Sequence, residues 1–429
     1  MLQTAHLGRL AHLQGDPNRV HDALEVIEDG ALLLDANGVI VLAGAREAIL
    51  KAAPLANRVD HGAAWLLPGL VDGHVHFPQF YATAAAGTGL LDWLNRSIFP
   101  AEKALADPGA AAPLASRFVR RLLRSGTTTA AVFGSQFLPA NAALFEAAAV
   151  GGLRLIAGAT LMDHGAPEDL LQTPEQAYAQ CKQLIEEYAA QPLLHYAVTP
   201  RFALSCSEAM LETCGALLKE FPQVYLHTHI NESPGEIEAV GRTFPWARHY
   251  LDVYARFGLL GERTILAHSI HSGAPELTHM AEARCAVCHC PGSNLFLGSG
   301  LFPLRAHQRH GLRVAVGTDV GAGTHFSVWN ELSECYKVQQ LQGHTLGVAE
   351  LLYLGTLGGA EALGLAAQTG NFAPGKSGDF IVLATEGDAY LAERLRRCDS
   401  LEDQLFCLIH LAGPCHMKAV YAGGREVSA

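Results

Sequence analysis

The stretch Pro68-Gly69-Leu70-Val71-Asp72-Gly73-His74-Val75-His76 leads from a short apolar run into a His-x-His pair. The apolar run, residues 66–71, predicts a buried strand, and the two histidines follow its end. Residues two apart on extended backbone point the same way, so both imidazoles can reach one metal ion. The same spacing also occurs in pairs of ordinary histidines, so the rest of the chain must decide between the two interpretations.

Seven further apolar runs of strand length follow, separated by stretches with helical periodicity. This alternation predicts parallel βα units, and eight such units predict a closed (β/α)8 barrel of the TIM type, an α/β fold. In the helix expected after the fourth run, Ser207 can act as the N-cap and apolar residues follow at spacings of three and four. The seven runs are 127–133, 153–161, 194–198, 223–228, 264–267, 285–288 and 313–317.

Both ends of the chain have the pattern of β structure. Asn37-Gly38 lies between apolar stretches and is a strong hairpin signal, because both residues tolerate positive φ. Near the C-terminus, residues 379–383 and 419–424 are typical of strands separated by glycine turns. We therefore expect the two ends to share one small β domain beside the barrel.

Composition narrows the class of partner. The chain has 429 residues, 49% of them hydrophobic, and a formal charge of -12. It therefore has no broad positive field for nucleic acid or an anionic membrane, and we expect a small-molecule partner. The N-terminus lacks the pattern of a secretory signal, and the longest apolar stretch, 144–162, is interrupted by charges. Ten scattered cysteines suit a reducing compartment, which favours a cytoplasmic location.

Three more metal-capable side chains fall at the ends of predicted strands. His229 and His268 close the fifth and sixth runs, and Asp319 follows the eighth. In a βα barrel the carboxyl ends of the strands carry the active site. Imidazoles with one carboxylate suit zinc or iron(II) better than magnesium or calcium, so we expect zinc. The fourth run ends in Thr199-Pro200-Arg201, without a lysine to bridge two ions, which favours a single ion.

Glu232 lies three residues after His229 and can face the same cavity. A carboxylate beside a metal-activated water can take its proton and pass it on, although an ordinary solvated loop acid has the same pattern. His227, two residues before His229, could be mistaken for the ligand. We favour His229 because Glu232 follows it.

The segment Cys285-Ala286-Val287-Cys288-His289 matches the attachment pattern of c-type haem. On a strand, residues three apart face opposite sides, so both thiols cannot attach to one porphyrin. We interpret these cysteines, and Cys290, as structural.

Three segments that bracket most of the chain, residues 68–76, Gly317-Thr318-Asp319 and residues 370–379, resemble the metal-dependent amidohydrolase superfamily. The resemblance implies a (β/α)8 barrel and a small β-sandwich formed from both termini. On this basis we expect a β-sandwich domain at 1–66 and 371–429 and a barrel domain at 67–370.

Longer strings are similar to the guanine deaminase family within that superfamily. They are His76-Phe77-Pro78-Gln79, Leu90-Leu91-Asp92-Trp93-Leu94, Phe99-Pro100-Ala101-Glu102, Thr199-Pro200-Arg201-Phe202-Ala203-Leu204-Ser205-Cys206-Ser207, His229-Ile230-Asn231-Glu232 and Cys290-Pro291-Gly292-Ser293-Asn294-Leu295. Relatives often show Met-Asp-x-Asn where this chain has Met162-Asp163-His164-Gly165, and other residues at Asn231 and Gly292. These departures bear on fine substrate preference.

The resemblance also implies roles for individual residues. One zinc ion per chain, or alternatively iron(II), would be held by His74, His76, His229 and Asp319. Glu232 would shuttle protons, His268 would help to orient the water, and Asp319 would assist in its deprotonation. The purine would be bound by Gln79, Trp93, Arg201 and Phe202. The family likeness further suggests a homodimer.

The expected reaction is hydrolytic deamination of guanine to xanthine and ammonia, a step of purine catabolism or salvage. Arg201 and Gln79 can pair with the polar edge of guanine while Phe202 stacks on the ring. Two alternatives remain open. One is deamination or dechlorination of a related ring, such as 8-oxoguanine or an s-triazine. The other is an inactive barrel that serves as an interaction module, which would be expected to lose metal ligands.

Overall fold

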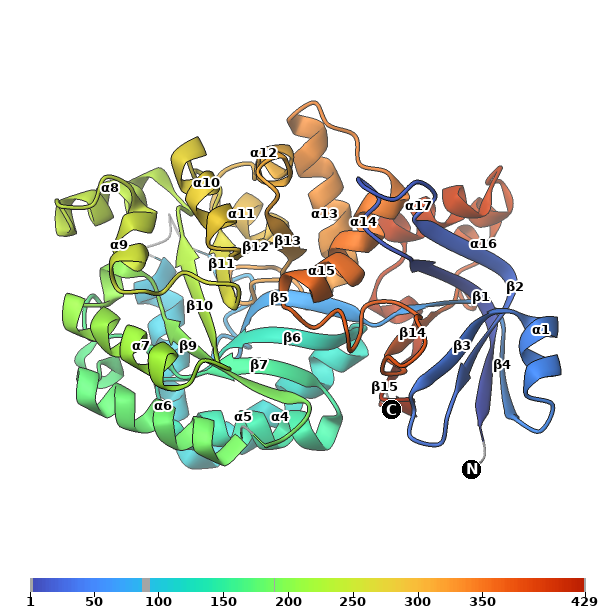
Figure 1. Ribbon diagram of the computed structural model, residues 1–429, viewed down its shortest axis with the longest axis horizontal. Helices are drawn as coiled ribbons and strands as arrows, with labels where there is room; N and C mark the ends of the chain where they lie inside the picture. The colour runs from blue at the N-terminus through green and yellow to red at the C-terminus, as the bar shows by residue number, and fades with distance from the viewer. Residues whose placement is uncertain (1–2, 87–92, 189, 428–429) are drawn as a thin grey trace. The chain divides into compact units, whose positions relative to one another are not determined.

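The computed structural model describes residues 3–86, 93–188 and 190–427, so Leu90, Leu91 and Asp92 of the family-like strings lie outside the described residues. The chain divides into two compact units (Figure 1). One comprises Met1–Val71, Arg120–Thr129 and Ser327–Ala429, and the other comprises Asp72–Val119 and Ala130–Phe326. The domain bounds expected from the family likeness stay a prediction.

Eight parallel strands form a nearly closed barrel, which confirms the predicted fold class. Their order is β5 (Leu70–His76), β6 (Thr127–Phe133), β7 (Arg154–Gly158), β9 (Leu194–Pro200), β10 (Tyr225–Ile230), β11 (Thr264–His268), β12 (Ala286–His289) and β13 (Arg313–Val316). A short extra strand, β8 (Thr160–Leu161), pairs with β9. Backbone hydrogen bonds of 2.8 Å, from Asp319 N–H to His74 O and from His76 N–H to Val320 O, tie β5 to the segment that follows β13.

The bounds predicted for the first barrel strand were wrong. Residues 66 and 67 belong to β4 (Asn57–Pro68) of the other sheet, and the barrel strand begins only at Leu70. One continuous apolar run thus serves two strands with Gly69 between them. A Cβ on Gly69 would lie 2.1 Å from Oγ1 of Thr128, so the close approach to β6 requires glycine. His74 and His76 consequently lie within the strand rather than after it.

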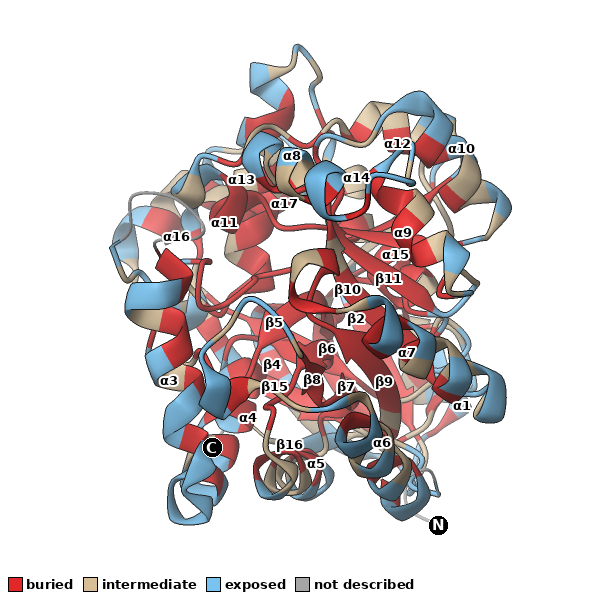
Figure 2. Cartoon of the chain, turned by 90° about the vertical axis from the view of Figure 1, so that its left-hand side faces the viewer, coloured by how far each residue is buried: buried red, intermediate tan, exposed pale blue. Residues whose placement is uncertain are grey.

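Amphipathic helices cover the barrel strands. Ser207 caps α7 (Glu208–Glu220) by accepting a hydrogen bond from Met210 N–H at 3.1 Å, as the sequence predicts. Figure 2 shows buried strands such as β9 and the exposed outer faces of α6 (Pro174–Tyr188) and α7. The other helices of this unit are α3 (Phe99–Lys103), α5 (Leu138–Gly151), α8 (Pro234–Thr243), α9 (Tyr250–Arg256), α10 (Ala274–Glu282), α11 (Pro291–Leu297) and α12 (Leu304–Arg309).

The other unit contains a mixed sheet to which both ends of the chain contribute. Its order is β16 (Arg425–Glu426), β15 (Met417–Ala422), β14 (Phe380–Leu383), β4, β1 (Thr4–Leu13), β2 (Leu24–Leu34) and β3 (Ile40–Ala45). Leu10, Leu66 and Phe380 are fully buried in its core, so strands from both ends share one hydrophobic cluster. The predicted turn at Asn37-Gly38 joins β2 to β3, with φ of 77° at Gly38.

The remaining helices of this unit follow the barrel strands in the sequence. They are α13 (Val328–Leu341), α14 (Val348–Gly355), α15 (Leu357–Ala362), α16 (Ala389–Arg396) and α17 (Leu401–Leu411). Helix α1 (Arg46–Ala52) precedes the barrel, and α4 (Pro108–Arg124) falls in the ranges of both units. Within the described part of the chain, no helix combines the length and apolarity needed to cross a membrane.

Candidate metal centre and active site

Four metal-capable side chains converge at the carboxyl end of the barrel. His74 and His76 lie on β5, His229 lies on β10, and Asp319 follows β13. One ligand atom from each lies within 4.8 Å of the others. Oδ1 of Asp319 is 3.2 Å from Nε2 of His74 and 3.3 Å from Nε2 of His76, whose Nε2 is 3.2 Å from Nε2 of His229. The sequence predicted this set.

These separations fit a single ion. Nitrogen or oxygen ligands about 2.0–2.1 Å from a tetrahedral ion lie about 3.3 Å from each other. Three imidazoles and one carboxylate are also the donor types that zinc and related transition metals bind. The four residues therefore form a plausible metal site.

The backbone around the site is arranged by a buried carboxylate and a glycine. Asp72 accepts hydrogen bonds from Thr318 N–H (3.0 Å), Thr318 Oγ1 (2.6 Å) and His74 N–H (3.2 Å). A Cβ on Gly317 would lie 2.8 Å from His74 N, so only glycine permits this approach. Asp319 itself has a positive φ of 46°, which turns the chain sharply beyond β13. These contacts bring the Asp319 loop onto β5.

Hydrogen bonds to the Nδ1 atoms orient two of the imidazoles. Nδ1 of His229 lies 2.5 Å from the backbone oxygen of Arg201, and Nδ1 of His74 lies 2.8 Å from Nε2 of His227. Each Nε2 is thereby directed to the common centre, as in metal sites where the second ring nitrogen is held by a partner. His229, rather than His227, lies in the four-residue set.

Burial controls the ionisation of the set. Loss of solvation lowers the pKa of His74 to about 4 and holds the pKa of His229 well below its usual value. Burial alone would raise the pKa of Asp319, but its contacts with His74 and His76 outweigh this and keep the pKa well below the usual range. At neutral pH His74 and His229 are therefore neutral and Asp319 is a carboxylate, the forms that bind metal.

Glu232 follows β10 and lies beside His268, as expected. Its Oε2 is 3.7 Å from Nε2 of His268, which is 3.9 Å from Oδ2 of Asp319. Ser299 donates a hydrogen bond of 3.0 Å to Oε1 of Glu232. Burial raises the pKa of Glu232, an effect that the nearby His268 partly opposes. A carboxyl group with a raised pKa is a better proton acceptor and can return the proton during the reaction.

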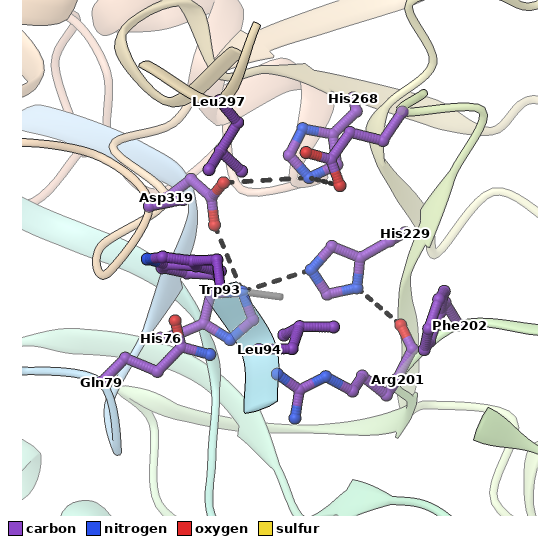
Figure 3. A pocket seen from close by; sticks show the side chains of 12 residues that line it. His76, Gln79, Trp93, Leu94, Arg201, Phe202, His229, His268, Leu297 and Asp319 are labelled. Carbon is purple, nitrogen blue, oxygen red and sulfur yellow. Dashed lines mark hydrogen bonds and ion pairs between the residues drawn. The ribbon is translucent and has the colours of Figure 1, made fainter. Parts of the chain in front are cut away.

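A pocket of about 420 Å³, including space open to solvent, lies next to these residues (Figure 3). Figure 3 shows Asp319 and His268 at one side and Gln79 and Arg201 at the other. Every residue that the sequence predicted for the site lines the pocket except His74, which is buried behind it. The lining residues are His76, Gln79, Trp93, Leu94, Arg201, Phe202, His229, Glu232, His268, Leu297, Asp319 and Ala322.

Sequence reasoning missed several residues that hold the site together. Ser293 donates a 2.5 Å hydrogen bond to Oδ2 of Asp319, and Asn294 contacts Nδ1 of His268 at 2.9 Å. Glu102 is buried and binds Arg201 and Gln79. All three lie in the family-like strings, but a lone Ser, Asn or Glu gives no signal of its own there. Gly165, Asn231 and Gly292, the positions at which the sequence was expected to depart from its relatives, do not line the pocket.

Comparison with known proteins agrees with this architecture. Residues 65–427 match the amidohydrolase family. The chain is 45% identical to the probable guanine deaminase of Deinococcus radiodurans, covering 98% of this chain and 97% of that protein. It is 40% identical to the guanine deaminase of Escherichia coli, covering 96% and 94%. The solved structure of E. coli guanine deaminase superposes with a TM-score of 0.94 at 38% identity, covering 100% and 99% of the two chains.

A family match that spans the barrel, together with relatives at 45% and 40% identity over nearly their full length, places this chain in the amidohydrolase family and, within it, among the guanine deaminases.

Proposed function

We propose that this protein catalyses the hydrolytic deamination of guanine, in which guanine and water give xanthine and ammonia. The assignment of guanine as the substrate rests on membership of the guanine deaminases. One observation ties this substrate to the site: N–H donors from Gln79, Trp93 and Arg201 line the pocket beside the three-histidine, one-aspartate set.

The lining donors suit the acceptor atoms of guanine. Nε1 of Trp93 is buried and has no hydrogen-bond partner among the residues that the structure describes. The guanidinium of Arg201 and the amide of Gln79 are buried at the same pocket. A carbonyl oxygen and ring nitrogens can accept from these groups, and Phe202 supplies an apolar surface for the ring. Adenine has no carbonyl, so it would leave a buried donor unpaired and is expected to be rejected.

We assign metal binding to His74, His76, His229 and Asp319. Zinc is the ion that we propose, one per chain, with iron(II) as the alternative, because both suit this donor set. When bound there, such an ion lowers the pKa of a water molecule towards neutrality and makes it a stronger nucleophile.

We assign proton transfer to Glu232. It accepts a proton from the water that attacks C2 of guanine and donates it to the ring nitrogen next to C2. His268 and Asp319, on either side of the attacking water, hold its orientation by hydrogen bonds. The tetrahedral C2 then loses its amino group as ammonia when Glu232 delivers the second proton of the water. Hydrolysis is thereby balanced, with the water oxygen retained in xanthine.

Arg201, Gln79, Phe202 and Trp93 hold the ring so that C2 faces Glu232. The backbone oxygen of Arg201 also contacts Nδ1 of His229. Arg201 therefore contributes both to binding of the guanine ring and to the orientation of a metal ligand. A homodimer and a cytoplasmic location remain predictions for this protein.

The decisive experiment measures xanthine and ammonia production from guanine by purified protein. It is repeated after chelation and after adding back zinc or iron(II) separately. The proposal expects activity that chelation removes and that one of the two ions restores, with adenine turned over at least about 100-fold more slowly. Inclusion of 8-oxoguanine and an s-triazine tests the related substrates. Absence of xanthine and ammonia production from guanine by the metal-loaded protein would overturn the substrate assignment.

A further inference from the structure

Glu102 is a buried acid that the reaction proposed above does not use. It lies on α3 with only 2% of its surface exposed. Nη1 of Arg201 lies 2.9 Å from its Oε1 and 2.7 Å from its Oε2. Gln79 donates a hydrogen bond of 3.1 Å to Oε1, and Gln136 donates one of 3.0 Å to Oε2. Both oxygens of one carboxylate are thus occupied by donors, two of which come from residues that line the pocket.

We propose that Glu102 is the positioning residue of the purine subsite, fixing which atoms of Arg201 and Gln79 face the ligand. The proposal rests on the guanine deaminase function proposed above. It assigns Glu102 no contact with the substrate, since Glu102 does not line the pocket. Its effect is exerted through the two side chains that it holds.

The hydrogen bonds of Gln79 determine the orientation of its amide. Oε1 accepts from Gly321 N–H at 3.0 Å, and Nε2 donates to Glu102. Because the carboxylate can only accept, the amide nitrogen must face Glu102 and the oxygen must face Gly321. The second N–H of Nε2 is then the group left for a ligand. Glu102 therefore makes Gln79 a donor towards the pocket rather than an ambiguous amide.

Glu102 acts on Arg201 in a second way. Nη1 is engaged by both carboxylate oxygens and by Sδ of Met162 at 3.7 Å, while Nε and Nη2 have no hydrogen-bond partner among the described residues. Arg201 is only 4% exposed, so the positive charge of its guanidinium has little access to water. A buried charge of this kind needs its counter-ion, and loss of one partner leaves the other uncompensated. Glu102 thus holds the guanidinium of Arg201 through Nη1 and leaves Nε and Nη2 available to bind a ligand.

The contacts predict a specific result for Glu102→Gln. The substituted side chain keeps the size of glutamate but loses the charge, and it places an NH2 group against donors from its neighbours. Arg201 and Gln79 then lose their fixed orientations. We expect the Kd of xanthine, the product, to rise at least tenfold in the zinc-loaded protein, because misplaced donors weaken binding of the ring. Zinc content is expected to stay at the native level, since Glu102 touches no residue of the metal set.

Two further variants separate positioning from general destabilisation. Glu102→Asp keeps the charge but withdraws the carboxylate by one methylene, so it cannot reach Arg201 and Gln79 together. Its Kd for xanthine is also expected to rise at least tenfold, even if Glu102→Gln does not fold. Gln136→Met is the matched control, because it removes a donor to Glu102 that does not line the pocket. Its Kd is expected to stay within twofold of native.

The measurement is calorimetric titration of each zinc-loaded protein with xanthine, which gives Kd and stoichiometry separately. A positioning role raises Kd at unchanged stoichiometry. A merely structural role lowers the stoichiometry, because some molecules are misfolded, and leaves the Kd of the remaining molecules as in the native protein. That outcome, or native Kd in both Glu102 variants, overturns the inference. Native protein that neither deaminates guanine nor binds xanthine overturns the proposed function instead, before any variant is compared.

Discussion

Nδ1 of His74 lies 2.8 Å from Nε2 of His227, so a second histidine supports the ring of a residue in the metal set. A hydrogen bond between two rings needs one donor and one acceptor. If His74 binds the ion through Nε2, its proton is on Nδ1 and His227 must accept. Burial holds the pKa of His227 well below its usual value, so its ring is neutral and able to accept. Its own proton then sits on Nδ1, which is buried without a partner in the described part of the chain.

This relationship predicts how substitutions at His227 change metal affinity. His227→Phe keeps a flat ring but cannot accept a hydrogen bond, so we expect zinc affinity to fall about 10- to 100-fold. His227→Gln offers an oxygen acceptor and should retain most of the affinity. Competition with a chromophoric chelator measures both. Excess zinc should restore guanine turnover in His227→Phe, and native affinity in that variant would show that His74 needs no support from His227.

Glu232→Gln tests the proton-transfer assignment. The amide keeps the size of the side chain but cannot accept and release a proton, so kcat should fall by about 10²- to 10⁴-fold with metal content unchanged. Steady-state kinetics and metal analysis measure the two quantities. Ser299→Ala is the matched control because it leaves the carboxyl group in place and removes only the bond from Ser299, which lowers the pKa of Glu232. In Ser299→Ala we expect the acid limb of the pH profile of kcat to move to higher pH. A native kcat in Glu232→Gln would contradict the assignment of proton transfer to Glu232.

The parts of this site that the sequence predicts are those that follow from local patterns. The parts that it does not predict depend on contacts between residues far apart in the chain. His74 and His76 are recognisable because their spacing of two places both imidazoles on one face of a strand. His229 and Asp319 are recognisable because each falls at the end of a predicted barrel strand, and parallel strands end at the same side. The eightfold βα alternation likewise predicts the barrel.

Other features depend on contacts that no local pattern encodes. Glu102 meets Arg201 across 99 positions of the chain, and a single acid on a short helix does not reveal that partner. The start of β5 was misplaced because apolar residues continue from β4 through Leu70, so hydrophobicity alone does not locate the break at Gly69. The roles assigned to individual side chains stay predictions, which the variants described here address.

Trp93→Phe tests the unpaired indole donor of the pocket. Nε1 of Trp93 is buried without a partner among the described residues, so a ligand acceptor is the group that can satisfy it. Phenylalanine keeps the aromatic surface and removes the donor. Loss of one hydrogen bond, about 0.5–1.5 kcal/mol, should raise KM for guanine about 2- to 10-fold with little change in kcat.

The control for Trp93→Phe is the same substitution at Trp329. Nε1 of Trp329 donates a 2.9 Å hydrogen bond to the backbone oxygen of Leu408, and Trp329 does not line the pocket. Trp329→Phe should lower thermal stability because a buried hydrogen bond is lost, although the Leu408 oxygen keeps its 2.9 Å bond from Ala412 N–H, while KM stays at the native value. Steady-state kinetics and thermal melts on both variants test this. Equal KM in Trp93→Phe and native protein would mean that the indole N–H does not meet the substrate.

The acid stability of the protein should depend on His289. Its ring stacks on Phe302 at 4.4 Å between centroids, and both ring nitrogens are buried without a hydrogen-bond partner in the described residues. Burial, and then the electrostatic effects of His307 and His268, lower the pKa of His289 to about 3. In the unfolded chain the pKa of this histidine is about 6.5. Below that pH the unfolded state therefore binds a proton at His289 that the folded state does not bind.

The sign of the effect follows from this depressed pKa. The stability due to neutral His289 is complete above pH 6.5 and is lost as the pH falls from 6.5 towards about 3. At pH 5 the loss amounts to about 2 kcal/mol. His289→Phe keeps a ring against Phe302 but cannot take up a proton, so native protein should lose about 2 kcal/mol more than this variant between pH 7.5 and pH 5. Urea unfolding of the metal-free proteins at both pH values measures the difference, since release of metal in acid then plays no part. An equal loss of unfolding free energy in the two proteins would mean that His289 is protonated in the folded state as readily as in the unfolded chain.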